Sequence, residues 1–340
     1  MSKYRVIRLP RALSPVVPVA LLLGLLAIGG AETEDPSRPD AQAVWRAMFK
    51  RPQLAPAPPD NPLTSEKIAL GEALFSDARL SGRGDRSCAS CHRPELAFTD
   101  GRRRAQGVSG APLRRNTPTL YNLAWGKQFF WDGRAASLEA QAAMPIEAPD
   151  EMGGDWPTIL RRLGEDAGTA ALFRVAFGEA EAPSRENVVK ALACYVRSLV
   201  SPPTRFDAWI EGDAGALTAA ELRGFQIFTG KGACMLCHVG WRFTDDKFHD
   251  VGVPGDDGGR GLVPGGTPGL SAFKTPGLRE LSRTAPYMHD GSKATLQAVA
   301  AHYAGGFVAR PSLAPSLRRD LRLSARERAD LVAFLASLSR

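Results

Sequence analysis

Residues 88–92 read Cys-Ala-Ser-Cys-His, and residues 234–238 read Cys-Met-Leu-Cys-His. The pattern Cys-x-x-Cys-His is typical of covalent c-type haem attachment, in which both thiols bond to the porphyrin and the histidine ligates the iron. A zinc site would gather four Cys or His ligands around one ion, and a thioredoxin-like redox pair does not need the adjacent histidine. The sequence therefore predicts two covalently bound haems, held by Cys88, Cys91 and His92 and by Cys234, Cys237 and His238.

The sequence that follows each motif is repeated, which indicates an internal duplication. Phe98-Thr99-Asp100 corresponds to Phe243-Thr244-Asp245, and from Thr117 onward the two halves align at a constant offset of 158 residues. Little of the chain has the alternating pattern of strands, so we expect a mainly α fold with two cytochrome-c-like haem domains related by duplication. The Pro-rich segment near residues 201–203 predicts a domain boundary, with the first domain at residues 32–203 and the second at residues 204–340.

Capping residues predict where several helices begin. Thr64-Ser65-Glu66 favours a helix that runs to Phe75, and a second helix is expected to begin at Ser137. Thr218 with Glu221, and Ser324 with Glu327, form capping boxes. Residues 32–62 are rich in Pro, Ala and Asp and are expected to form a surface tail, and the Gly- and Pro-rich residues 251–269 are expected to form a loop.

The N-terminus is typical of a cleaved secretory signal at residues 1–31. Four basic residues precede an apolar run from Val16 to Ile28, which is short for a membrane span. The leader therefore predicts a periplasmic protein with no membrane span after cleavage. The whole chain has a formal net charge of +7, four of which belong to the leader, so the charge is no argument for nucleic-acid binding. Cys194, outside both motifs, lies in an apolar helical pattern and is expected to be a buried inert thiol.

The offset of 158 residues pairs Pro145 with Tyr303 and Trp131 with His289. If the equivalent positions Pro145 and Tyr303 face the iron, Tyr303 could be the sixth ligand of the second haem, whereas Pro145, which has no donor atom, would leave the first haem open. An open iron position favours chemistry on a small molecule over simple electron transfer. Three other residues compete with Tyr303 as the ligand: Met288, His289 and His302.

Several polar residues follow Trp131 and could lie near the open haem: Gln141, Glu147, Asp150 and Glu151. Cleavage of peroxide at an iron needs a group that moves a proton between the two oxygens, and a partly desolvated carboxyl such as that of Glu151 can do so. No histidine lies between His92 and His238, so that segment supplies no distal histidine. Trp131 is either an oxidisable link between the two haems or a packing residue against one of them.

These residues together resemble the bacterial di-haem cytochrome c peroxidase and MauG family. Besides the two haem motifs, the resemblance is carried by Ala97-Phe98-Thr99-Asp100-Gly101, Arg115-Asn116-Thr117-Pro118, Phe130-Trp131-Asp132-Gly133-Arg134 and Thr284-Ala285-Pro286-Tyr287-Met288-His289-Asp290-Gly291. The resemblance covers essentially the whole mature chain. It implies a calcium ion between the haems, with Asn116 and the carbonyl oxygens of Thr284 and Pro286 as protein ligands.

Within this family the chain is more similar to the MauG branch than to typical peroxidases. Typical members have Met as the sixth ligand of the second haem, whereas Tyr303 falls at that position here. Gln141, Pro145 and Glu151 follow Trp131 at the spacings of the distal-pocket residues of that branch. The chain departs from it at Gly232, where a surface Trp that relays electrons would be expected. Either Trp241 or another aromatic residue relays the electrons, or the substrate differs.

The resemblance implies a periplasmic oxidase that uses peroxide, or oxygen plus electrons, to oxidise Trp residues of a precursor protein. In the MauG branch this reaction forms tryptophan tryptophylquinone in methylamine dehydrogenase, the expected partner. The alternative is a cytochrome c peroxidase that reduces H2O2 with electrons from a small cytochrome or cupredoxin. A third hypothesis is a di-haem electron carrier that catalyses no reaction on a substrate. This hypothesis requires both irons to have six ligands.

Overall fold

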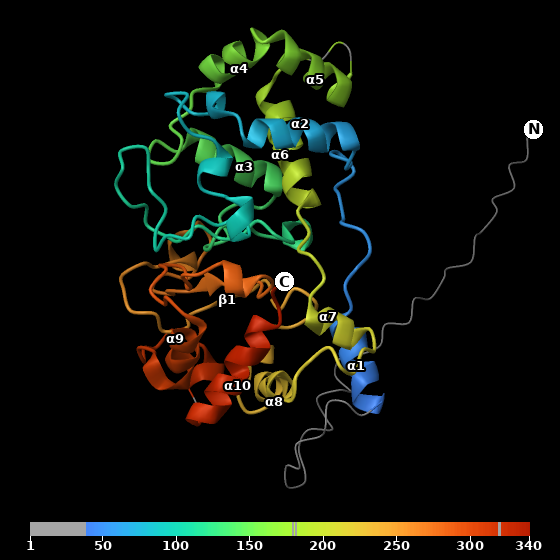
Figure 1. Ribbon diagram of the computed structural model, residues 1–340. Helices are drawn as coiled ribbons and strands as arrows, with labels where there is room; N and C mark the ends of the chain where they lie inside the picture. The colour runs from blue at the N-terminus through green and yellow to red at the C-terminus, as the bar shows by residue number, and fades with distance from the viewer. Residues whose placement is uncertain (1–38, 179, 181, 319–320) are drawn as a thin grey trace, which may run out of the picture. The chain divides into compact units, whose positions relative to one another are not determined.

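The computed structural model describes residues 39–178, 180, 182–318 and 321–340, so the predicted signal at residues 1–31 lies outside it. The described residues form one compact unit of ten α-helices, two short strands and several 3-10 turns (Figure 1). The prediction of a mainly α fold is confirmed. The helices are α1 (Pro39–Phe49), α2 (Ser65–Phe75), α3 (Leu138–Glu147), α4 (Trp156–Gly164), α5 (Ala167–Phe177), α6 (Arg185–Ser198), α7 (Arg205–Ile210), α8 (Ala219–Thr229), α9 (Leu296–Ala301) and α10 (Ala325–Ala336); the strands are β1 (Phe248–His249) and β2 (Phe273–Lys274).

The helices begin where the capping residues predict. Thr64 precedes α2 and its side chain accepts a hydrogen bond from the Lys67 amide, and Ser137 caps α3 in the same way. The predicted capping boxes at Thr218 and Ser324 are both formed, with α8 and α10 following them. These side chains satisfy amide groups that have no partner within the helix, which fixes the first residue of each helix.

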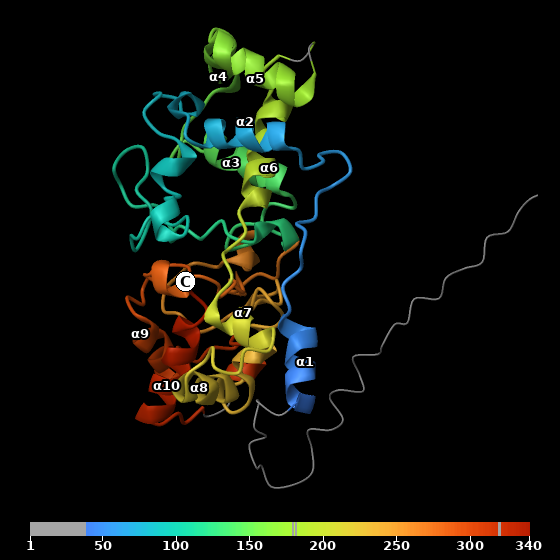
Figure 2. The same ribbon diagram turned by 45° about the vertical axis from the view of Figure 1, so that its right-hand side comes forward.

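Two helix pairs cross at very short separation, α2 with α6 and α8 with α10 (Figures 1 and 2). A glycine permits each approach, because a Cβ atom on Gly71 would overlap the Ala191 carbonyl and one on Gly224 would overlap the Asp330 carbonyl. Helices can pack this closely only where one of them has no side chain at the crossing point.

Gly224→Ala is expected to destabilise the protein by about 1–3 kcal/mol, since the added methyl group forces α8 away from α10. Gly164→Ala is the matched control, because Gly164 is also helical and has open space around its Cβ position. Denaturant unfolding of the haem-loaded protein measures both variants. Equal unfolding midpoints for the two variants would contradict this account of the crossing.

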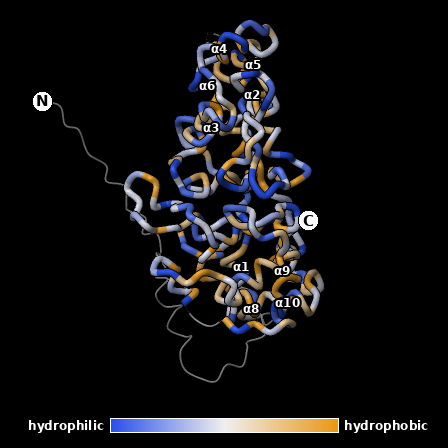
Figure 3. The backbone as a smooth tube through the Cα atoms, turned by 90° about the vertical axis from the view of Figure 1, so that its left-hand side faces the viewer, coloured by the Kyte–Doolittle hydropathy of each residue, from blue (hydrophilic) through white to orange (hydrophobic). Residues whose placement is uncertain are grey.

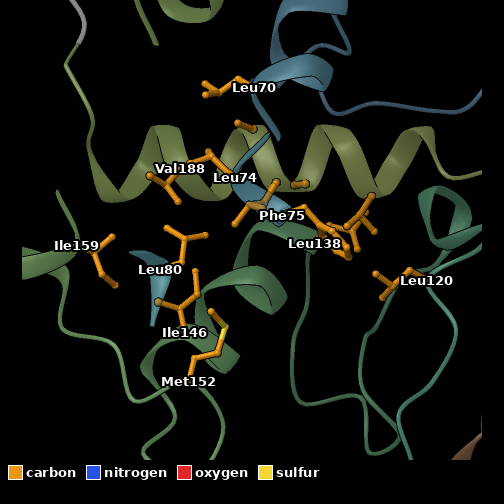
Figure 4. Packing of buried hydrophobic residues seen from close by; sticks show 14 of the residues in the cluster. Leu70, Leu74, Phe75, Leu80, Leu120, Leu138, Ile146, Met152, Ile159 and Val188 are labelled. Carbon is orange, nitrogen blue, oxygen red and sulfur yellow. The ribbon is translucent and has the colours of Figure 1, made fainter. Parts of the chain in front are cut away.

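Two hydrophobic clusters fill the interior of the described unit. The first is largely aliphatic and is formed by α2, α3, α4 and α6, with Leu70, Leu74, Ile146, Ile159 and Val188 among its members (Figure 4). The second is aromatic and contains Phe206, Phe225, Phe228, Phe243 and Phe334. In Figure 3 hydrophobic residues colour much of the tube near α9 and α10, and α10 contacts both α8 and α9. Each cluster packs against the residues of one haem-attachment motif, the first against Cys88 and the second against Cys234.

The expectation of a surface tail at residues 32–62 is wrong for residues 39–49, which form α1. Phe49 is fully buried in the aromatic cluster, where its ring lies 5.1 Å from that of Phe243. Trp45 and Met48 pack against the same cluster, and the spacing of these three residues places them on one face of a helix. The short apolar face therefore outweighs the Pro-rich composition of the segment.

The long segment after the second motif is mostly irregular, as expected for residues 251–269. Its antiparallel strands β1 and β2 pair Phe248 with Lys274, and the Lys274 amide donates to the Trp131 carbonyl at 2.7 Å. This bond joins residues that lie far apart in the sequence. Among the described helices, none is long and apolar enough to cross a membrane.

Candidate haem and active site

The two Cys-x-x-Cys-His motifs adopt the same local structure. Each begins with a 3-10 turn, Cys88–Ser90 in the first and Cys234–Leu236 in the second. In both motifs the histidine amide donates to the carbonyl of the first cysteine at 2.9 Å. This turn directs two thiols and an imidazole to one side of the chain, and none of the cysteines in the described part forms a disulfide.

The two histidine rings are held by equivalent hydrogen bonds. The His92 Nδ1 donates to the Phe98 carbonyl at 2.8 Å, and the His238 Nδ1 donates to the Phe243 carbonyl at 2.9 Å. A carbonyl can only accept, so Nδ1 carries the proton and Nε2 is available to an iron. Burial lowers the pKa of both histidines, which favours the neutral imidazole that ligates metals.

Both motifs line one cavity of about 890 Å³, to which each contributes its two cysteines and its histidine. The lining is mostly apolar, as a porphyrin requires. Among the described lining residues, seven Arg or Lys side chains outnumber three Asp or Glu side chains. Three of these cations also pair with acids outside the lining, Arg115 with Asp257, Arg242 with Asp246 and Arg279 with Asp207, so a small positive surplus remains for the haem propionates. The donor atoms, the cavity and its charge therefore fit two haems.

Of the residues predicted near the open haem, Gln141, Pro145, Asp150 and Glu151 line this cavity. The prediction is wrong for Glu147, whose carboxylate lies outside the lining and accepts hydrogen bonds from Trp156 and Arg185 instead. Gln141 and Pro145 lie on α3, and Glu151 follows the helix in a turn where its amide donates to the Ala148 carbonyl at 3.1 Å. Burial raises the pKa of Glu151 above its ordinary value, Arg134 opposes the shift and Asp150 adds to it. The Glu151 charge acts on Cys91, which places this carboxyl on the side of the first motif.

Trp131 lines the cavity and forms hydrogen bonds to residues of both halves of the sequence. Its indole Nε1 donates to the Asn116 carbonyl at 2.9 Å, and its own carbonyl accepts from Lys274. The Asn116 amide in turn donates to the His289 carbonyl at 2.8 Å. These bonds hold the indole in one orientation in the cavity wall, so either role predicted from the sequence, electron link or packing residue, remains a prediction.

Tyr303 lines the cavity from a π-helical turn at His302–Gly306. Burial raises its pKa, and the neighbouring Cys234 and Cys237 act in the same direction, so the hydroxyl lies on the side of the second motif. Of its competitors, His302 points elsewhere: its Nε2 donates to the Val251 carbonyl at 2.8 Å. Met288 and His289 also line the cavity, but the His289 ring stacks on Phe273 at 3.5 Å.

The three calcium ligands implied by the resemblance, Asn116, Thr284 and Pro286, all line the same cavity. The Asn116 Nδ2 donates to the Arg102 carbonyl at 2.8 Å, an arrangement that leaves the Oδ1 oxygen for a cation. Amide and carbonyl oxygens are the donors that calcium prefers. The residues present therefore fit a calcium ion, and the ligand set itself stays a prediction.

Two features of the site were not predictable from sequence spacing. Trp125 and Trp241, 116 residues apart, form an edge-to-face pair with ring centroids 4.6 Å apart. Beside the second motif, the His249 Nε2 donates to Asp245 at 2.8 Å. This bond, together with the neighbouring Cys237 sulfur, raises the pKa of His249 to about 10. Asp245, His249 and Cys237 resemble a metal-ligand group, but Cys237 is needed for haem attachment.

Comparison with known proteins identifies close relatives. Residues 65–215 match the profile of the family described as di-haem cytochrome c peroxidase. The methylamine utilization protein MauG of Methylorubrum extorquens is 48% identical over 96% of both chains, and that of Methylophilus methylotrophus is 45% identical over 86% of this chain and 88% of its own. A crystal structure of a MauG-like protein associated with microbial copper homeostasis superposes with a TM-score of 0.77, at 33% identity, over 86% of this chain and 95% of the other.

Proposed function

This chain belongs to the di-haem cytochrome c peroxidase and MauG family, and on that premise we propose that it is a periplasmic oxidase of the MauG type. It is a haem-dependent oxidoreductase. The proposed substrate is a precursor protein whose Trp residues are oxidised, as in tryptophan tryptophylquinone formation in methylamine dehydrogenase. The observation that carries the proposal is the pairing of an open distal wall at Pro145 with a tyrosine, Tyr303, on the side of the second motif.

Two haems, bound through thioethers to the four motif cysteines, would supply the iron that reacts with peroxide and holds the oxidising equivalents. His92 and His238 would hold the two irons through Nε2 as neutral imidazoles, because a carbonyl fixes each Nδ1 proton. Pro145 has no side-chain donor, so it keeps the other side of the first site open. Tyr303 would provide a hard oxygen ligand for the second site, where a phenolate would favour the more oxidised states of iron.

Glu151 and Gln141 would serve the first site. Because burial raises the pKa of Glu151, its carboxyl group can hold a proton at a pH where an exposed glutamate has lost it. That proton can be delivered to the departing oxygen of peroxide from the carboxyl Oε, which makes Glu151 a general acid. The Gln141 amide lies in the same wall and can orient the bound peroxide by hydrogen bonding.

Trp131 and the pair of Trp125 and Trp241 would carry electrons. Trp131 is fixed between Asn116 and Lys274, from where its indole can pass an electron between the two sites. At the position expected for a surface Trp the chain has Gly232, so the entry point lies elsewhere. Trp241, three residues after His238 and in contact with Trp125, is our candidate for the residue that accepts electrons from the protein substrate.

Trp241→Phe is expected to slow oxidation of the protein substrate by about tenfold or more, a barrier increase of about 1.4 kcal/mol, because phenylalanine is much harder to oxidise than tryptophan. The reaction of the haems with peroxide should not change. Trp156→Phe is the control, since Trp156 bonds to Glu147 and neither residue lines the cavity. Stopped-flow absorbance with and without substrate measures both steps, and an unaffected substrate step would assign the entry point to another residue.

We also propose that the chain consists of a signal peptide at 1–31 and two duplicated haem domains, residues 32–203 and 204–340. The equivalent motif turns and the equivalent glycine crossings at Gly71 and Gly224 support the duplication. In that case α1 belongs to the first domain by sequence but packs against the aromatic cluster of the second domain.

The experiment that tests the proposed substrate combines purified haem-loaded protein, H2O2 and precursor methylamine dehydrogenase. We expect the quinone absorbance to appear, together with a mass change confined to the Trp-bearing subunit. The family also supports a second candidate, a peroxidase with a small electron donor. Fast peroxide turnover with reduced cytochrome c and no change in the precursor would favour that candidate over ours.

A further inference from the structure

Lys274 is a buried ammonium in the wall of the haem cavity. Its side chain is only 13% exposed, and it lies on β2 with its amide bonded to the Trp131 carbonyl. Burial lowers its pKa, Arg242 acts in the same direction, and Asp246 opposes them. A buried lysine is costly unless an anion compensates its charge.

The protein itself supplies too little negative charge at this position. The carboxylate of Asp246 lies 3.4 Å from the Lys274 Nζ, and it already forms a closer ion pair with Arg242. One carboxylate is therefore shared between two cations. Of the three donor positions on the Lys274 ammonium, this single long contact occupies one, as far as the described residues show.

The neighbouring cavity wall is also positive. Arg242, Lys274 and Arg279 line the cavity on this side, whereas its three acidic lining residues, Asp132, Asp150 and Glu151, all belong to the first half of the sequence. The charge of Arg279 is compensated by Asp207 at 2.6 Å. Lys274 and Arg242 share the single carboxylate of Asp246, so one positive charge on this side has no partner among the described acidic residues. An anion held inside the cavity is needed to balance it.

We propose that Lys274 pairs with a propionate of the second haem and thereby raises the reduction potential of that haem. The carboxylate comes from the porphyrin edge of the second haem, since Lys274 pairs with Phe248 of β1 and the adjacent His249 lies within 4.8 Å of Cys237 of the second motif. Pairing compensates the buried ammonium, and the positive charge near the iron favours the ferrous form. The contact with Trp131 places the same charge next to the residue proposed to link the two haems.

Lys274→Gln tests this inference through the midpoint potentials of both haems, measured by spectroelectrochemical titration of the loaded protein. The reduction equilibrium of the second haem should shift toward the ferric form by roughly tenfold, the order expected for one unit charge acting over about 10 Å at an effective dielectric constant of about 20. Lys274→Arg should keep the wild-type potential. Lys247→Gln, at an exposed lysine, should leave both potentials unchanged.

Asp246→Asn is the second variant, and it should shift the potential of the second haem in the opposite direction, because it frees Lys274 and Arg242 from their carboxylate. Haem content, measured by absorbance, verifies loading in each variant. If the Lys274→Gln protein does not bind both haems, the proposal is tested by the direction in which Asp246→Asn shifts the reduction potential of the second haem. A wild-type potential in the loaded Lys274→Gln protein, a shift confined to the first haem, or a lower potential in Asp246→Asn would overturn the proposal.

Discussion

Tyr303→Phe is expected to change the absorption spectrum of the second haem and to abolish oxidation of the protein substrate. The substitution removes one oxygen atom and keeps the ring that packs against Leu313 and Leu317. If that oxygen ligates the iron, the iron loses a ligand and its spin state and spectrum must change. Substrate oxidation should fall below detection, because the second site no longer favours the oxidised states.

Tyr287→Phe is the matched control for this experiment. Tyr287 also lines the cavity, but its hydroxyl donates to the Leu281 carbonyl at 2.9 Å, so it is not available to an iron. We expect Tyr287→Phe to have a wild-type spectrum. A wild-type spectrum in Tyr303→Phe would refute the ligand assignment and make Met288 the next residue to test, since it lines the same cavity.

Glu151→Gln is expected to slow the reaction with peroxide by roughly 10²–10⁴-fold, the usual contribution of a positioned general acid. The resting spectra of both haems should stay unchanged, because Glu151 does not ligate iron in this account. Glu151 must be protonated to act as the acid, so the wild-type rate of the peroxide reaction should fall as the pH rises through the elevated pKa of this group. The rate of Glu151→Gln should be low and lack this step.

Asp150→Asn provides the control for the second prediction. Asp150 is exposed and adjacent, and its charge contributes to the raised pKa of Glu151. Its replacement should keep most of the peroxide reactivity and move the pH step slightly downward. If Asp150→Asn loses as much activity as Glu151→Gln, the two carboxyls act as a unit and Glu151 is not the sole acid.

The parts of the site that could be predicted from the sequence are those encoded by local patterns. The two motifs contain every atom that attaches a haem, and their turns follow from five consecutive residues. Ser137 and Thr218 form caps that depend on residues three positions away. The sequence prediction that Cys194 is buried is also confirmed, because its side chain is fully buried, and its inertness stays a prediction that the raised pKa of this thiol supports.

The parts that could not be predicted depend on tertiary packing. Helix α1 is stabilised because Trp45, Met48 and Phe49 pack against an aromatic cluster, most of whose residues lie more than 150 positions away in the sequence. The Trp125 and Trp241 pair and the contact between Lys274 and Trp131 likewise join segments that have no common local pattern. Composition alone made residues 39–49 look like a tail, because it does not record which apolar residues share a helix face.

The most direct test of the central claim is the addition of one equivalent of H2O2 to the fully ferric protein, with no reductant present, while the spectra of both haems are recorded. We predict that both spectra change and that the new state lasts longer than mixing, because the first site reacts and the second shares the oxidation. A ferric protein that stays inert until one haem is reduced would contradict the account. It would identify a peroxidase that depends on a donor cytochrome, and the placement of Tyr303 would then be wrong.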